Sequence, residues 1–166
     1  MTKEIMEQRA AGCQNSAVQF STIIVANLML INSGALFAFP AYLQKAVAIT
    51  PAVVAATSAP STSFVVGVVL ATLCGYVAYL NYGLLRQAAY TDHFIDDINL
   101  KYPISSGLSP AIIEWRSKTL TELTKKSERF TNLIWATFWF GQVLGLGSLA
   151  AFVIGCYLAK SAIFAQ

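Results

Sequence analysis

One short segment of the sequence groups side chains that could bind a metal ion or move a proton. His93 lies next to Asp92, and Asp96 and Asp97 follow His93 by three and four residues. On a helix these intervals bring side chains onto one face. A metal site needs about three or four ligands around the ion, and the sequence has no second cluster that would complete this one. We therefore interpret the segment as a solvated acidic face and expect neither a metal nor a cofactor.

The other residue types do not form a catalytic set. His93 is the single histidine, which excludes a haem held by two axial imidazoles. No serine or cysteine has a base at a suitable spacing, and there is no phosphate-binding loop. All eight Asp and Glu residues lie outside the apolar stretches, so a proton relay across a membrane would lack its usual carboxylates. We expect that the protein is not an enzyme.

The composition is that of a membrane protein. The chain is 56% apolar and 11% charged, whereas soluble domains carry about 25% charged residues. Its charge-free stretches are 10–44, 46–85 and 130–159. Each is long enough for the ~20 residues that cross ~30 Å of hydrocarbon as a helix. We predict an all-α integral membrane fold, a single membrane domain over residues 1–166, with transmembrane helices at 20–43, 63–85 and 132–157.

The segments outside these spans are also expected to be mostly helical. Residues 1–19 read as an amphipathic lead-in to the first span. Pro51 and Pro60 predict a short loop between the first two spans, because proline cannot continue a helix. Residues 86–131 predict a helical hairpin that is continuous with the second and third spans.

The hairpin carries its own start and stop signals. Its first arm has an apolar face at Phe94, Ile95 and Ile98, at helical spacing. Pro103 ends this arm. Ser109 is a good N-cap and Pro110 suits the first helical position, so the second arm should begin there.

The distribution of Lys and Arg predicts the orientation. Nine of the eleven basic residues lie before the first span or between the second and third, and only Lys45 and Lys160 lie on the other side. By the positive-inside rule the N-terminus and the hairpin are cytoplasmic and the C-terminus is outside.

The first predicted span contains polar residues that an anchor would not need. They are Ser21, Asn27, Asn32 and Ser33. A polar side chain in hydrocarbon costs free energy unless it finds a partner or water. These side chains therefore either line a pore or form hydrogen bonds between helices, and the sequence leaves both open. Gly34 and Pro40 would permit a kink in this helix.

Small residues recur every four positions in the other two spans. They are Gly67, Ala71 and Gly75 in the second span and Gly141 and Gly145 in the third. Such faces let membrane helices approach closely. Because small faces occur in more places than a three-helix unit needs, we expect a homo-oligomer.

A basic segment precedes the third span. It contains Arg116, Lys118, Lys125, Lys126 and Arg129. Basic residues next to a membrane contact anionic lipids, and we expect membrane lipids as partners. The alternative is a docking surface for a cytoplasmic regulatory protein or an anionic ligand such as a nucleotide.

Three spans, a short outer loop, a cytoplasmic hairpin and the segment LINSGALFAFPAYL at residues 30–43 together resemble a group of small bacterial inner-membrane proteins. Some of that group belong to phage-defence operons, where membrane effectors open under the control of a partner. The resemblance implies a multi-pass protein of the bacterial inner membrane with a role in antiviral defence. It assigns no role to Asn32, Ser33, Gly34 or Pro40.

Two functions stay open at this point. One is an oligomeric effector or ion channel whose pore is gated through the cytoplasmic region, and the polar residues of the first span favour it. The other is a non-conducting membrane anchor or scaffold subunit of a larger complex, which the absence of charge in that span favours.

The orientation can be tested with a reporter enzyme fused after Gln166. Because the basic residues lie mainly on the opposite side, the reporter should be active outside the cytoplasm. Alkaline phosphatase and green fluorescent protein fusions give complementary readouts. A fusion that is active only in the cytoplasm would show that the predicted orientation is wrong.

Overall fold

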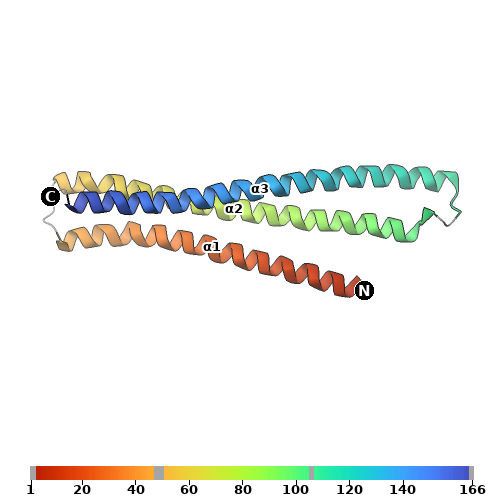
Figure 1. The fold of residues 1–166 in the computed structure, drawn as a ribbon, viewed down its shortest axis with the longest axis horizontal. Helices are drawn as coiled ribbons and strands as arrows, with labels where there is room; N and C mark the ends of the chain where they lie inside the picture. Colours follow the sequence, from red (N-terminus) through yellow and green to blue (C-terminus); the bar gives the residue numbers. More distant parts are fainter. Residues whose placement is uncertain (1–2, 47–50, 105–106, 165–166) are drawn as a thin grey trace. The chain divides into compact units, whose positions relative to one another are not determined.

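The computed structural model describes residues 3–46, 51–104 and 107–164, and these residues form three α-helices (Figure 1). They are α1 (Lys3–Ala46), α2 (Pro51–Lys101) and α3 (Pro110–Phe164). The described residues contain no strand, which confirms the all-α prediction. Each helix contains a stretch that is long and apolar enough to cross a membrane.

The helices are longer than one membrane crossing requires. α2 has 51 residues and α3 has 55, which at 1.5 Å per residue corresponds to roughly 75–85 Å of helix. A bilayer core is only about 30 Å thick. Neither helix contains a break, so both continue from the apolar stretch into the charged segment, and the amphipathic lead-in 1–19 likewise continues from Lys3 into the rest of α1.

The predicted loop through Pro51 and Pro60 is wrong, because residues 51–62 belong to α2. Pro51 is the first residue of the helix, where its missing N–H costs no hydrogen bond. Pro60 is buried inside the helix. Its missing N–H removes one hydrogen bond of the helix, to the carbonyl four residues earlier. Two neighbouring hydroxyls bond to other carbonyls of the same helix: Ser58 Oγ donates to Ala55 O and Thr62 Oγ1 donates to Ser58 O, both at 2.8 Å.

α2 and α3 each contribute to two compact units. One unit, which we call the bundle, comprises Met1–Val77 and Phe140–Gln166. It contains α1, the first half of α2 and the second half of α3. The other unit, which we call the hairpin, is Ala78–Trp139. It contains the remaining halves of α2 and α3 and the turn between them.

The bundle packs around Phe64 of α2, which is 2% exposed. Phe64 clusters with Phe39 of α1 and Ala159 of α3, and its ring lies 6.1 Å from that of Phe152. Gly155 makes this packing fit: a Cβ at Gly155 would overlap the Phe64 ring. The large aromatic ring therefore occupies the space that a side chain on α3 would need.

The small residues predicted from the sequence also pack inside this one chain. Ala71 is fully buried. A Cβ on Gly75 would lie 3.0 Å from Val25 of α1, and one on Gly141 would lie 3.6 Å from Val77 of α2. Gly145 likewise faces Cys74 of α2 and Leu28 of α1. The premise that these faces exceed the needs of three helices is thus wrong, and the homo-oligomer stays a prediction without that support.

The hairpin closes through a mixed apolar and polar contact between its arms. Ile98 is buried, and the Tyr102 ring meets the edge of Trp115 at 5.5 Å. Arg116 donates to Asn99 Oδ1 at 2.7 Å. Phe94, which was predicted on the same apolar face as Ile98, is instead 63% exposed.

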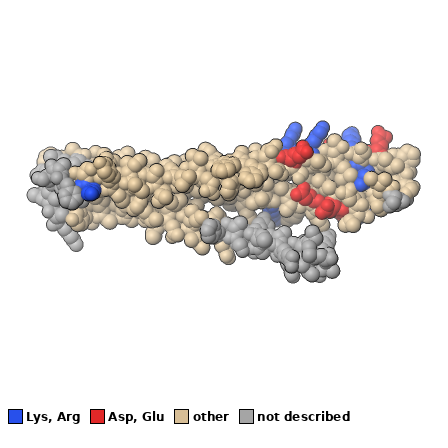
Figure 2. Space-filling model, in the orientation of Figure 1, with Lys and Arg blue, Asp and Glu red and all other residues tan. Residues whose placement is uncertain are grey.

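The hairpin turn follows the predicted signals. α2 ends at Lys101, two residues before Pro103, and α3 begins at Pro110. The Ser109 carbonyl accepts the N–H groups of Ile112 and Ile113 at 3.0 and 3.1 Å, which forms the first turn of α3. On the face drawn in Figure 2, most of the charged side chains lie over the hairpin.

The role of Gly155 can be tested against a glycine that has free space. Gly155→Ala should destabilise the bundle by about 1–3 kcal/mol, because the new methyl group overlaps the Phe64 ring. Gly83→Ala is the matched control: an added Cβ there meets no atom within 4 Å, so it should be neutral or stabilise by up to ~1 kcal/mol through helix propensity. Thermal unfolding in mild detergent measures both. Equal stability of the two variants would contradict the packing described here.

Candidate functional site

The most buried polar contact of the protein joins all three helices of the bundle. Asn32 of α1 and Ser148 of α3 are both 0% exposed. Asn32 Nδ2 donates to Ser148 Oγ at 3.1 Å and to the Leu28 carbonyl of its own helix at 3.0 Å. Ser148 Oγ in turn donates to the Gly67 carbonyl of α2 at 2.8 Å. We call this arrangement the Asn32 contact.

The Asn32 contact exists only because Gly67 has no side chain. A Cβ at Gly67 would overlap the Asn32 carboxamide, with Oδ1 as the nearest atom. Oδ1 is buried and accepts no N–H or O–H hydrogen bond from the described residues. It lies instead against the Gly67 Cα, in the place where weak Cα–H···O contacts recur between closely packed helices. Gly67 of α2 and Asn32 of α1, which the sequence analysis treated separately, therefore belong to the same contact.

The energetics assign this contact a structural role. An Asn side chain in hydrocarbon is costly without a partner, and an interhelical hydrogen bond in a membrane contributes about 0.6–2 kcal/mol. Asn32 bonds to the Leu28 carbonyl of its own helix and to Ser148 of α3. Asn32 thus lies between the helices of one molecule.

The other polar residues predicted on α1 lie elsewhere. Ser21 Oγ donates to Val18 O and Ser33 Oγ donates to Met29 O, at 2.9 and 2.6 Å, so both are satisfied within α1. Asn27 is exposed and has no hydrogen bond to any described residue. Asn27 and Asn32 therefore face in different directions, one out of the bundle and one into it.

The two residues expected to kink α1 lie within a continuous helix. Gly34 is exposed, and an added Cβ there would meet no atom within 4 Å. Pro40 is partly buried, and α1 continues past it to Ala46.

The hairpin contains a second polar contact that the sequence analysis missed. Asn81 Nδ2 donates to the Ile134 carbonyl at 2.8 Å and to Thr137 Oγ1 at 2.7 Å. In the bundle, Ser63 Oγ donates in the same way to the Ala151 carbonyl at 2.7 Å. The sequence feature that could have predicted these contacts is an amide or hydroxyl group within a charge-free stretch. Such a group is expected to form a hydrogen bond to a neighbouring helix.

The basic segment of α3 is not uniform. Lys118, Lys125, Lys126 and Arg129 are exposed. Arg116 is partly buried and bonds to Asn99, so it belongs to the contact between the arms. Two acidic residues interrupt the rest of the segment, Glu122 and Glu128.

The acidic segment around His93 also contributes to hairpin contacts. Asp92 Oδ1 accepts a hydrogen bond from Ser127 Oγ of the opposite arm at 2.7 Å. The Asp97 carboxylate accepts a hydrogen bond from Lys101 Nζ at 2.7 Å and raises the pKa of that ammonium group. Within the described part of the chain, no three metal-ligating side chains come together.

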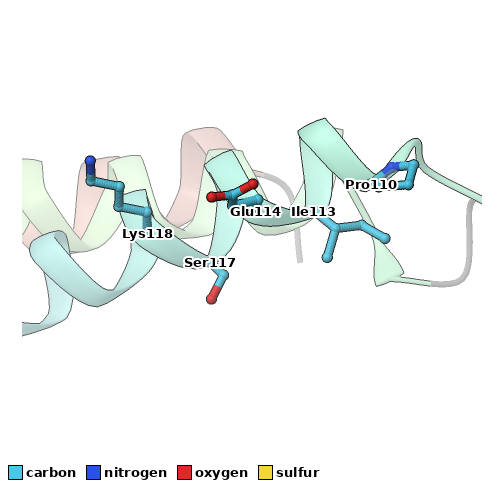
Figure 3. A pocket seen from close by; sticks show the side chains of 5 residues that line it. All are labelled: Pro110, Ile113, Glu114, Ser117 and Lys118. Carbon is cyan, nitrogen blue, oxygen red and sulfur yellow. The ribbon is translucent and has the colours of Figure 1, made fainter.

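A depression on the hairpin surface lies along the first turns of α3 (Figure 3). Its lining residues are Pro110, Ile113, Glu114, Ser117 and Lys118. These residues form one stripe along a single helix, so they offer no opposite wall that would enclose a small molecule. The depression is an open surface and does not resemble a ligand pocket.

Comparison with models of protein families, with characterised proteins and with solved structures finds no match to this chain. The functional inference therefore depends on the residues and contacts described above.

The link between Gly67 and Asn32 can be tested by suppression. Gly67→Ala should lower the unfolding midpoint in detergent, because the methyl group displaces the Asn32 carboxamide from Ser148. In an Asn32→Ala background, which removes the colliding group, Gly67→Ala should cost much less. We expect a coupling energy of about 1–3 kcal/mol in this double-mutant cycle. Additive effects would show that the two residues do not share one site.

Proposed function

We propose that the protein is a non-enzymatic scaffold of the bacterial inner membrane. The bundle would anchor the chain in the bilayer, and the hairpin would lie in the cytoplasm and bind a partner protein. The observation that carries this proposal is the use of the buried polar groups: Asn32 Nδ2 donates to Ser148 Oγ, and Ser148 Oγ donates to the Gly67 carbonyl. The deepest polar groups are thus used for packing, which favours a scaffold over a pore lined by Asn32.

Aromatic side chains support the placement of the bundle in a membrane. Tyr76 and Tyr79 of α2 and Trp135 and Trp139 of α3 are each between 58% and 71% exposed. Tyr and Trp are enriched at the boundary between hydrocarbon and water. All four lie near the point in the sequence where the charge-free stretches meet the charged hairpin. This is where a bilayer surface would cross the two helices.

Exposed apolar residues support partner binding by the hairpin. Tyr90 and Phe94 are 59% and 63% exposed on adjacent turns of α2. Arg86 lies over the Tyr90 ring at 5.6 Å. Large apolar groups surrounded by charges are typical of protein interaction surfaces. A partner would cover these rings, and the flanking charges would orient it.

A channel-like effector gated through the hairpin is the second candidate, because two amides remain exposed in the apolar part of the bundle. Asn27 and Gln142 are both exposed, and neither has a hydrogen bond to a described residue. They lie at a similar level, since Val25 faces Gly75 and the nearby Leu28 faces Gly145. In an oligomer such amides could line a water-filled path.

Reconstitution in liposomes separates the two functions. Purified protein in vesicles loaded with a fluorescent ion indicator should release or admit ions no faster than empty vesicles if it is a scaffold. A photoreactive residue placed at Phe94 in cells should then form one discrete cross-link to a cytoplasmic protein. The same probe at Thr72, an exposed residue of the bundle, is the matched control and should form none.

Ion flux that depends on the protein, and that is lost in Asn27→Leu, would overturn the scaffold and support the channel. Absence of a discrete cross-link at Phe94 in cells, together with absence of ion flux in the vesicles, would contradict both proposals.

A further inference from the structure

One face of α1 points away from the bundle over its whole apolar length. Ile23, Leu30 and Phe37 on this face are 57%, 71% and 76% exposed. Asn27 and Gly34, which alternate with them, are also exposed. The intervals between these five residues are four, three, four and three, the heptad spacing by which two helices pack along a continuous seam. We call these residues the outer face of α1.

α1 is the least covered helix of the bundle. In the most apolar 18 residues of its span, Ser21–Tyr42, 11% of residues are buried in the chain, against 28% for the corresponding 18 residues of α2 and α3. The span carries no charged residue, so two such faces would not repel each other. Lipid can cover the apolar side chains of this face, so those side chains alone are not evidence for a protein partner.

Asn27 is the residue that lipid cannot satisfy. It is the sixth residue after Ser21, about 9 Å into the apolar span at 1.5 Å per residue. Its carboxamide is exposed and has no hydrogen bond within the described chain. Hydrocarbon offers no donor or acceptor, so this group needs a partner of its own kind or water. A carboxamide carries both a donor and an acceptor and can pair with an identical group.

We propose that the outer face of α1 binds a second copy of this chain, with Asn27 of each copy bonded to Asn27 of the other. A two-fold axis places identical residues opposite each other, and an asparagine at a seam position specifies register and oligomeric state in coiled coils. The pairing satisfies both amides at once. It does not depend on the scaffold role proposed above.

Gly34 independently favours a helix as the occupant of this face. Glycine in a helix costs about 1 kcal/mol relative to alanine, and nothing in the chain requires it, because a Cβ at Gly34 would meet no atom within 4 Å. Gly34 lies seven residues after Asn27, on the same face. A glycine there allows a second helix to approach closely, whereas lipid would gain nothing from it.

The test uses energy transfer between donor-labelled and acceptor-labelled full-length chains in phosphatidylethanolamine–phosphatidylglycerol vesicles. The parent should associate with a saturable dependence on the protein-to-lipid ratio. Asn27→Leu should weaken association about tenfold, as expected for loss of an interhelical amide pair. Gly34→Leu should weaken it at least as much, because its side chain fills the seam and touches nothing inside the chain.

The matched control is Thr72→Val. Thr72 is also exposed on the bundle, but its hydroxyl already donates to the Val68 carbonyl of its own helix at 2.9 Å, so its loss should leave association unchanged. All three variants should keep the parent's helical content, since each replaced side chain points outward. The proposal is overturned if the parent is monomeric at every ratio, if Asn27→Leu associates as tightly as the parent, or if Thr72→Val weakens association equally.

Discussion

The hydrogen bonds of Asn32 constrain how the three helices of the bundle pack. Its carboxamide needs partners, and it finds one on its own helix and one on Ser148 of α3. Ser148 Oγ in turn donates a hydrogen bond to the Gly67 carbonyl of α2. Since hydrocarbon supplies neither water nor an apolar driving force between helices, such bonds and close packing decide helix register. Sliding α1 by one residue would turn the amide away from Ser148 and break the hydrogen bond that joins α1 to α3.

The close packing around this contact follows the same constraint. Gly67 is a glycine because the Asn32 amide occupies the place of its side chain, and Gly155 is a glycine because Phe64 does. Large or polar side chains of one helix therefore pack against small residues of α2 and α3. Their four-residue spacing reflects contacts within one chain.

Two of the three asparagines of α1, Asn27 and Asn32, have different roles. They lie five residues apart, which places them about 140° apart around the helix axis. One is inside the bundle and bonded, whereas the other is outside and unpaired. An inward amide specifies the fold of the monomer. An outward amide in the apolar part of a helix needs a hydrogen-bond partner from outside the monomer. In a dimer that partner is the same amide of an identical chain, whereas in a channel it is water.

The sequence by itself was sufficient for the local features. The length of the three apolar stretches, the turn between Pro103 and Pro110 and the separation of charge from apolar surface follow from composition and capping, which act over a few residues. The loop at Pro60 was predicted wrongly because a proline inside a helix costs one hydrogen bond, which tertiary packing can offset, and Pro60 is buried. Phe94 was assigned to the wrong side because one turn of helix holds several apolar residues. Only the tertiary structure decided which amide points into the bundle. It also decided at which glycines a neighbouring side chain occupies the space of the missing Cβ. Helices that are apolar all around carry no periodic difference between the side facing other helices and the side facing lipid.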